Sequence, residues 1–70
     1  MKPLKEQQIL LQRLGYSVIV NGETSSQLTR SIKAFQRDLK REETGILSQS
    51  DVELLEKCVR NHVGGVNTHA

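Results

Sequence analysis

The chain has 70 residues, enough for one domain with a small hydrophobic core. Hydrophobic residues make up 36% of it and aromatic residues only 3%, so a deep ligand cavity is excluded and any binding site is expected to be a shallow groove. The net charge of +2 is compatible with an anionic partner but does not require one. The single cysteine, Cys58, excludes an internal disulfide, and no apolar run is long enough to span a membrane.

The first predicted element is a helix over residues 4–14, which are rich in good helix formers. Pro3 suits its first turn, and Leu11 and Leu14 fall near one face. Gly15 follows the last leucine, where a helix is expected to stop.

Residues 16–22 are irregular, with a tight turn predicted at Asn21-Gly22. This turn either shapes a ligand-contacting loop or simply links two packed elements, and the second role is the commoner one for Asn-Gly. Tyr16 likewise has two interpretations. It stacks on a sugar ring in a shallow site, or it covers the edge of the core.

A second helix is predicted over residues 26–41, with Ser25 or Ser26 as its cap. Its apolar residues recur at spacings of four, three and four, which places them on one narrow stripe. They are Leu28, Ile32, Phe35 and Leu39. This is the cleanest amphipathic pattern in the chain.

Basic residues fall opposite that stripe and raise the possibility of a nucleic-acid interface. They are Arg30, Lys33, Arg37, Lys40 and Arg41. Glu42, Glu43, Glu53 and Glu56 are near in sequence and the net charge is small, which favours a solvated face over a nucleic-acid partner.

A third helix is predicted from the capping box Ser48–Asp51 to about His62, with Val52, Leu55 and Val59 on its inner face. Residues 1–63 are expected to form the domain. Residues 64–70 have no periodicity and are expected to form a flexible tail.

Cys58 and His62 are four residues apart and could together contact a metal ion. Two ligands do not make a site, and His69 is at the far end of the chain. No third group would orient a catalytic Cys-His pair. We therefore expect no metal, no cofactor and no catalytic residue, with Cys58 as a small core residue.

The sequence thus predicts an all-α fold, a compact bundle of three short helices. The expected core consists of Leu11, Leu14, Val20, Leu28, Ile32, Phe35, Leu39, Leu47, Val52, Leu55 and Val59.

Four short motifs occur along the chain in a fixed order. They are Leu11-Gln12 with Leu14-Gly15-Tyr16, then Val20-Asn21-Gly22, then Ala34-Phe35-Gln36, and finally Thr44-Gly45-Ile46-Leu47. In this order and register the chain resembles the peptidoglycan-binding domain family over about residues 4–59. It departs from the family pattern at Thr24-Ser25, where the family has Phe-Gly. It departs again at Leu28, where the family has threonine, and at Asp51-Val52, where the family has Thr-Trp.

The resemblance implies a non-catalytic module that targets an enzyme or assembly of bacterial or phage origin to the bacterial cell wall. Its implied partner is peptidoglycan or a muropeptide, together with a linked hydrolase domain or partner protein, and no membrane. It implies a location at the wall or in the cell envelope, although no signal peptide is visible. An alternative is a protein-protein interaction domain that keeps the fold and has lost wall binding, which the departures favour.

The residues expected to bind ligand surround the turn into the second helix and are polar or amphipathic. They are Tyr16, Asn21, Glu23, Gln27 and Arg30.

Overall fold

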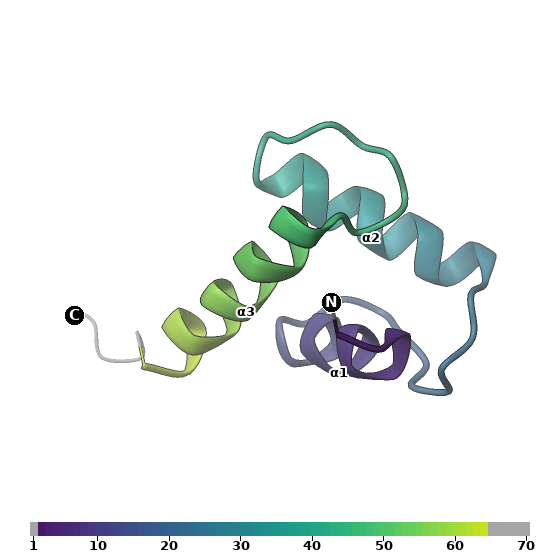
Figure 1. Cartoon of the computed structure of the whole chain (residues 1–70), viewed down its shortest axis with the longest axis horizontal. Helices are drawn as coiled ribbons and strands as arrows, with labels where there is room; N and C mark the ends of the chain where they lie inside the picture. Colours follow the sequence, from purple (N-terminus) through teal and green to yellow (C-terminus); the bar gives the residue numbers. More distant parts are fainter. Residues whose placement is uncertain (1, 65–70) are drawn as a thin grey trace.

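The computed structural model describes residues 2–64, and the side chains of residues 2–61. Within this part the chain forms three helices and no strand: α1 (Leu4–Arg13), α2 (Ser26–Asp38) and α3 (Gln49–Gly64). In Figure 1, α2 and α3 run in different directions and α1 lies below both, packed against each. The all-α three-helix prediction is therefore confirmed. The expected tail, residues 64–70, lies outside the described residues apart from Gly64, which ends α3.

Local signals explain where α2 and α3 begin. Ser25 is extended, and its hydroxyl accepts a hydrogen bond from the backbone N–H of Leu28, so Ser25 is the N-cap of α2. At α3, the Ser48 hydroxyl accepts from the Asp51 N–H while the Asp51 carboxylate accepts from the Ser48 N–H. This reciprocal pair is the predicted capping box.

The end of α2 was predicted three residues too late. The helix stops at Asp38 because Lys40 adopts a left-handed backbone conformation, with φ of 59°. The N–H groups of Lys40 and Arg41 then turn back to the carbonyl oxygens of Arg37 and Gln36, at 2.9 and 2.8 Å. The sequence offers no glycine at this stop, so periodicity alone extended the helix to Arg41.

One apolar core, aliphatic except for Phe35, lies between the three helices. Its buried members are Leu11, Val18, Leu28, Ile32, Phe35, Leu47, Val52, Leu55 and Val59. Leu14 and Leu39 are half-buried against it, but the prediction of Val20 was wrong, because Val18 takes the core position. Residues 16–20 belong to no helix, so no helical period indicated which valine faces inward.

Two buried glutamines hold the connecting loops to the helices. The Gln8 side-chain oxygen accepts from the N–H groups of Asn21 and Gly22 at 2.9 and 2.7 Å, and its amide donates to the Glu23 carbonyl at 2.8 Å. Gln36 does the same for the second loop, accepting from the Gly45 N–H and donating to the Ile46 carbonyl, both at 3.0 Å. Each loop therefore has a fixed shape.

Within residues 2–64, no helix combines the length and the apolar character needed to cross a membrane.

Candidate functional site

Tyr16 sits at the edge of the core, directly after α1. Its ring meets the ring of Phe35 edge to face, with the centroids 6.0 Å apart and the planes at 90°. Its hydroxyl donates a 2.6 Å hydrogen bond to Oδ2 of Asp38. Burial and this contact with a carboxylate raise the pKa of Tyr16 to about 12, so the hydroxyl is a neutral donor. These contacts support the core-edge interpretation of Tyr16.

The exposed side of Tyr16 borders a shallow hollow of about 490 Å³ between α2 and the segment that follows α1. We call it the Tyr16 hollow. Its lining residues are Gly15, Tyr16, Ser17, Gln27, Arg30, Ser31 and Ala34. The buried Ser31 hydroxyl donates a 2.6 Å hydrogen bond to the Ser17 carbonyl, which fixes one wall of the hollow against the other.

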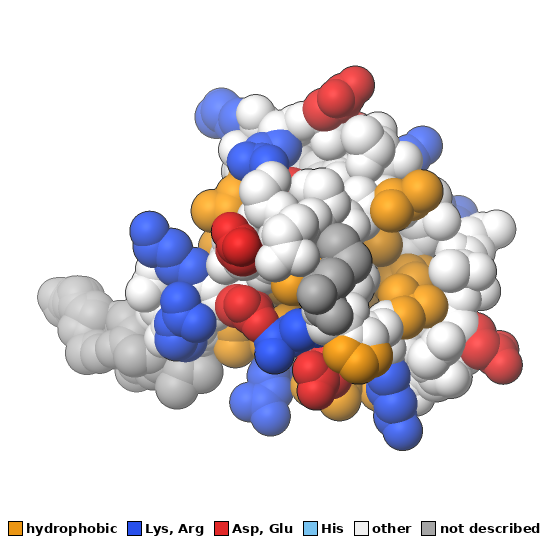
Figure 2. All heavy atoms as spheres, in the orientation of Figure 1, with side chains coloured by type: hydrophobic (Ala, Val, Ile, Leu, Met, Phe, Trp, Pro, Cys, Tyr) orange, Lys and Arg blue, Asp and Glu red, His pale blue; other side chains and the backbone are white. Residues whose placement is uncertain are grey.

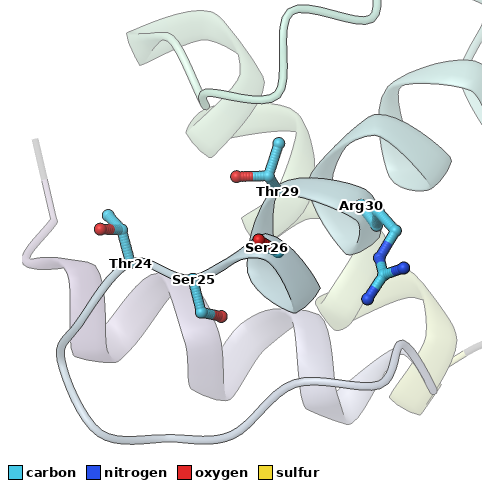
Figure 3. Close-up of a pocket in the computed structure, with 5 residues that line it drawn as sticks. All are labelled: Thr24, Ser25, Ser26, Thr29 and Arg30. Atoms are coloured by element: carbon cyan, nitrogen blue, oxygen red, sulfur yellow. The ribbon is translucent and has the colours of Figure 1, made fainter.

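A second shallow hollow, of about 390 Å³, lies around the start of α2 and shares Arg30 with the first. Figure 3 shows its lining residues, with Thr24 and Ser25 on the approach to the helix and Arg30 extending from its second turn. The first turn of α2 contains no acidic residue. The exposed N–H groups of a helix start carry partial positive charge, so Arg30 and this helix start together favour an anion.

Arg30 differs from other arginines of α2 and of the loop that follows in having no acidic partner. Arg37 pairs with Glu43 at 3.2 Å, and Arg41 pairs with Asp51. Within residues 2–61, no carboxylate lies within ion-pair distance of Arg30. Figure 2 shows Lys and Arg side chains spread around one face with acidic side chains among them. This arrangement favours a solvated basic face over a nucleic-acid interface.

The structure brings together Tyr16, Gln27 and Arg30 of the five expected ligand residues, because all three line the Tyr16 hollow. Asn21 and Glu23 line neither hollow. The Asn21 side-chain oxygen instead accepts from the Glu23 N–H and the Gln8 amide, at 2.9 and 3.2 Å, which supports the plain-turn interpretation. A ligand role for Asn21 and Glu23 stays a prediction.

Sequence reasoning missed Ser31 and Ala34 as lining residues. Both lie on the same side of α2 as Gln27 and Arg30, since residues three and four apart share a helix face. That spacing was visible in the sequence. Ser17 had no comparable signal, because its position depends on how the segment after α1 folds back.

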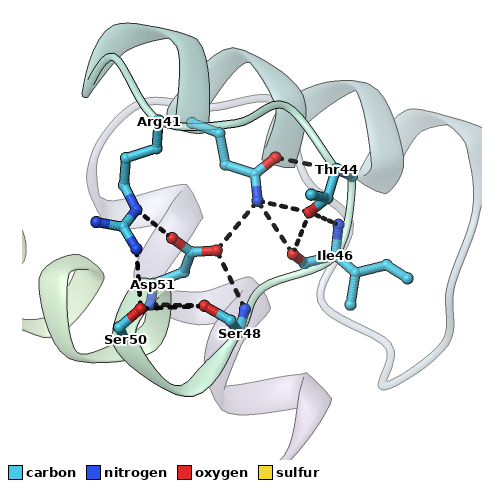
Figure 4. Close-up of polar contacts among 8 residues, drawn as sticks. Arg41, Thr44, Ile46, Ser48, Ser50 and Asp51 are labelled. Carbon is cyan, nitrogen blue, oxygen red and sulfur yellow. Dashed lines mark hydrogen bonds and ion pairs between the residues drawn. The ribbon is translucent and has the colours of Figure 1, made fainter.

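A third hollow, of about 390 Å³, lies beside the second loop and contains Arg41, Thr44, Ser48 and Asp51. Figure 4 shows that these polar groups bond mainly to one another: Asp51 contacts Arg41 and the Ser48 N–H, and Thr44 contacts the Ile46 carbonyl. Burial raises the pKa of the Asp51 carboxyl, but hydrogen bonds from Ser48, Gln36 and Arg41 outweigh it and hold the pKa below its ordinary value. This region is a structural network.

Cys58 is half-buried against the core, as expected for a small core residue. Among residues 2–61, no three His, Cys, Asp or Glu side chains lie close enough to hold a metal ion. The side chains of His62 and His69 lie outside the described residues.

The family model described as "Putative peptidoglycan binding domain" matches residues 2–55. Because the match spans well over half of the 70 residues, the chain belongs to the peptidoglycan-binding domain family. The family is defined as a binding domain and not as a catalytic one. No curated protein and no solved structure matches the chain.

The matched range takes in α1, α2 and most of the core. Four of the five residues that depart from the family pattern have structural roles in this chain. Ser25 caps α2, Leu28 and Val52 are buried in the core, and the Asp51 carboxylate accepts the Ser48 N–H in the capping box of α3. These departures therefore keep the fold intact.

Proposed function

We propose that this domain binds peptidoglycan without catalysis, with the Tyr16 hollow as its site, and holds a linked enzyme or assembly at the bacterial cell wall. The observation that carries the proposal is Arg30, which has no acidic partner among the described residues and lies between two shallow hollows of a peptidoglycan-binding domain. The stem peptides of peptidoglycan carry carboxylates, and a guanidinium binds a carboxylate through two parallel hydrogen bonds.

The shallow site supports weak binding at each contact. An exposed ion pair contributes about 0.2–1 kcal/mol, and Tyr16 and Gln27 add apolar contact and hydrogen bonds beside it. A polymer offers the same group many times, so rebinding along it compensates for the low affinity of one contact. A wall-targeting role fits this mode of binding.

Co-sedimentation of the full chain with isolated sacculi tests the proposal. We expect the wild-type chain to sediment with sacculi at low salt and to be released as salt rises. Arg30→Gln should weaken binding about two- to five-fold, the upper part of the range that corresponds to one exposed ion pair. Lys57→Gln is the matched control, since Lys57 is an exposed cation on α3 away from both hollows. The proposal fails if the wild-type chain stays in solution at low salt.

A second candidate function, a protein-protein interaction domain, is supported by one observation. Ile46 is 74% exposed beside a small apolar hollow of about 280 Å³, whose lining includes Leu4, Leu28 and Ile32. Large exposed apolar side chains next to an apolar hollow are typical of protein contacts. A flat response of the chain to sacculi and to muropeptides would favour this function over wall binding.

A further inference from the structure

Two opposite charges of α2 lie near the Tyr16 hollow: Arg30 lines it, and Asp38 accepts a hydrogen bond from the Tyr16 hydroxyl. We propose that the hollow takes the stem peptide in its uncross-linked form, with a carboxylate of the peptide at Arg30 and the free amine of its diamino acid at Asp38. This inference rests on the function proposed above and adds to it a preference for one chemical state of the wall.

The positions of the charges follow from the helix. Arg30, Ala34 and Asp38 succeed one another at intervals of four residues, so they form a slanting strip along α2. Tyr16 is near both ends of the strip. It lines the hollow together with Arg30, and its hydroxyl donates a hydrogen bond to Asp38. Ala34 lies between the two charges in this strip and also lines the hollow.

The length of the strip fits a short peptide. Eight residues of helix advance about 12 Å along the axis. An extended peptide covers the same distance with about three or four residues. In a stem tetrapeptide the terminal carboxylate is on the residue after the diamino acid, whose amine ends a long side chain. With that side chain extended away from the terminal carboxylate, the two charges match the strip in sign and separation.

Both charges are available to a ligand. Within residues 2–61, neither Arg30 nor Asp38 has an ion-pair partner, in contrast to Arg37. Asp38 accepts the Tyr16 hydroxyl at Oδ2, and Oδ1 has no hydrogen-bond partner among these residues. The Tyr16 hydroxyl thus holds the carboxylate in position and leaves one oxygen for an ammonium group.

Cross-linking changes the group that would meet Asp38. Joining two stem peptides forms one uncharged amide from the diamino-acid amine of one stem and the terminal carboxyl group of the other. The stem that supplies the amine keeps its own carboxylate for Arg30 but has no ammonium group left for Asp38. The hollow should therefore discriminate through Asp38 between free and cross-linked stems.

Amide-shift titration of the full chain with three peptides tests the inference. The probes are a synthetic stem tetrapeptide with lysine as its diamino acid, the same peptide with the lysine amine acetylated, and the same peptide with its C-terminal carboxylate amidated. For the wild-type chain, acetylation and amidation should each weaken binding about two- to five-fold. Shifts should centre on Tyr16, Arg30 and Ala34.

Two variants turn this into a thermodynamic cycle. Asp38→Asn keeps an oxygen for the Tyr16 hydroxyl but removes the charge, so it should bind the free and acetylated peptides equally well. Arg30→Gln should bind the free and amidated peptides equally well. Glu53→Gln and Lys57→Gln, exposed positions on α3, should keep the wild-type preferences.

The inference is overturned if Asp38→Asn still discriminates against the acetylated peptide as strongly as the wild-type chain does. It is also overturned if the wild-type chain sediments with sacculi but shows no preference among the three peptides, and in that case the proposed function stands. Failure to bind both sacculi and peptides would overturn the two together.

Discussion

Asp51 joins three parts of the molecule through one carboxylate. It is 5% exposed, caps α3 at Ser48, accepts from Gln36 of α2 and pairs with Arg41 of the second loop. A buried carboxylate is stabilising only when its oxygens are satisfied, and here each oxygen has at least one donor. The loop between α2 and α3 therefore depends on the charge state of Asp51.

Asp51→Asn should lower the free energy of unfolding by about 1–3 kcal/mol at neutral pH, because an amide nitrogen cannot accept the bonds that one carboxylate oxygen accepts. The pKa of Asp51 is lowered in the folded state, so its contribution is present above the ordinary pKa near 4 and is lost as pH falls through the folded value. Urea denaturation at pH 7 and pH 3 measures both effects.

We expect the wild-type chain to lose more stability between pH 7 and pH 3 than Asp51→Asn does. Glu53→Gln, which removes an exposed carboxylate from the same helix, should follow the wild-type pH dependence. An equal difference between wild type and Asp51→Asn at both pH values would show that the charge of Asp51 does not stabilise the fold.

The sequence indicated some of these residues and not others, for physical reasons. Tyr16, Gln27 and Arg30 could be predicted to lie near one another because a turn and a helical spacing place them there. Gln8 and Gln36 were not predicted to be buried, since a glutamine is usually exposed and only the folded loop supplies its partners. The positions of Asn21 and Glu23 depend on the same long-range contact with Gln8.

At the scale of elements, α1 and α2 end in the same way with different residues. In both, the residue two positions after the helix has a positive φ, which is 98° for Gly15 after α1 and 59° for Lys40 after α2. Both stops show the paired backbone hydrogen bonds of a Schellman motif. A glycine adopts this conformation without an energetic penalty, whereas a residue with a Cβ adopts it only with steric strain.

Lys40→Gly should therefore stabilise the domain by about 0.5–1 kcal/mol. The substitution removes the strain of the left-handed conformation, and the greater flexibility of glycine in the unfolded chain offsets part of that gain. The midpoint of thermal unfolding, followed by circular dichroism at 222 nm, should rise. Gly15→Ala is the matched opposite change. A Cβ at Gly15 meets no atom within 4 Å, so no steric contact adds to the cost. The expected cost is about 0.5–1 kcal/mol, which is the backbone strain minus the gain from a less flexible unfolded chain.

If both substitutions move the midpoint in the same direction, left-handed strain is not what governs these helix ends. A lower midpoint for Lys40→Gly would also show that left-handed strain does not govern this helix end. The substitution removes no ion pair within residues 2–61 that could otherwise explain a loss of stability.

At the scale of the whole molecule, the helical periods predicted the fold because each helix buries a single stripe. Leu28, Ile32 and Phe35 on α2, and Val52, Leu55 and Val59 on α3, all occupy the core as expected. What periodicity could not supply is the path of the two loops, which is set by the buried amides of Gln8 and Gln36. The Tyr16 hollow and the hollow at the start of α2 both lie against the first of these loops, so their shape required the folded chain.

Phe35 is the largest side chain of this small core and is 1% exposed. Phe35→Ala should lower the free energy of unfolding by about 3–5 kcal/mol, through lost burial and the cavity left behind. A core in a domain of this size rarely supplies more than about 3–5 kcal/mol, so the variant should be largely unfolded at 25 °C.

Phe35→Leu, which keeps most of the volume, should unfold cooperatively at a lower midpoint. Circular dichroism and urea denaturation distinguish these outcomes. A cooperatively folded Phe35→Ala would mean that α1 and α3 hold together without the ring that joins them to α2.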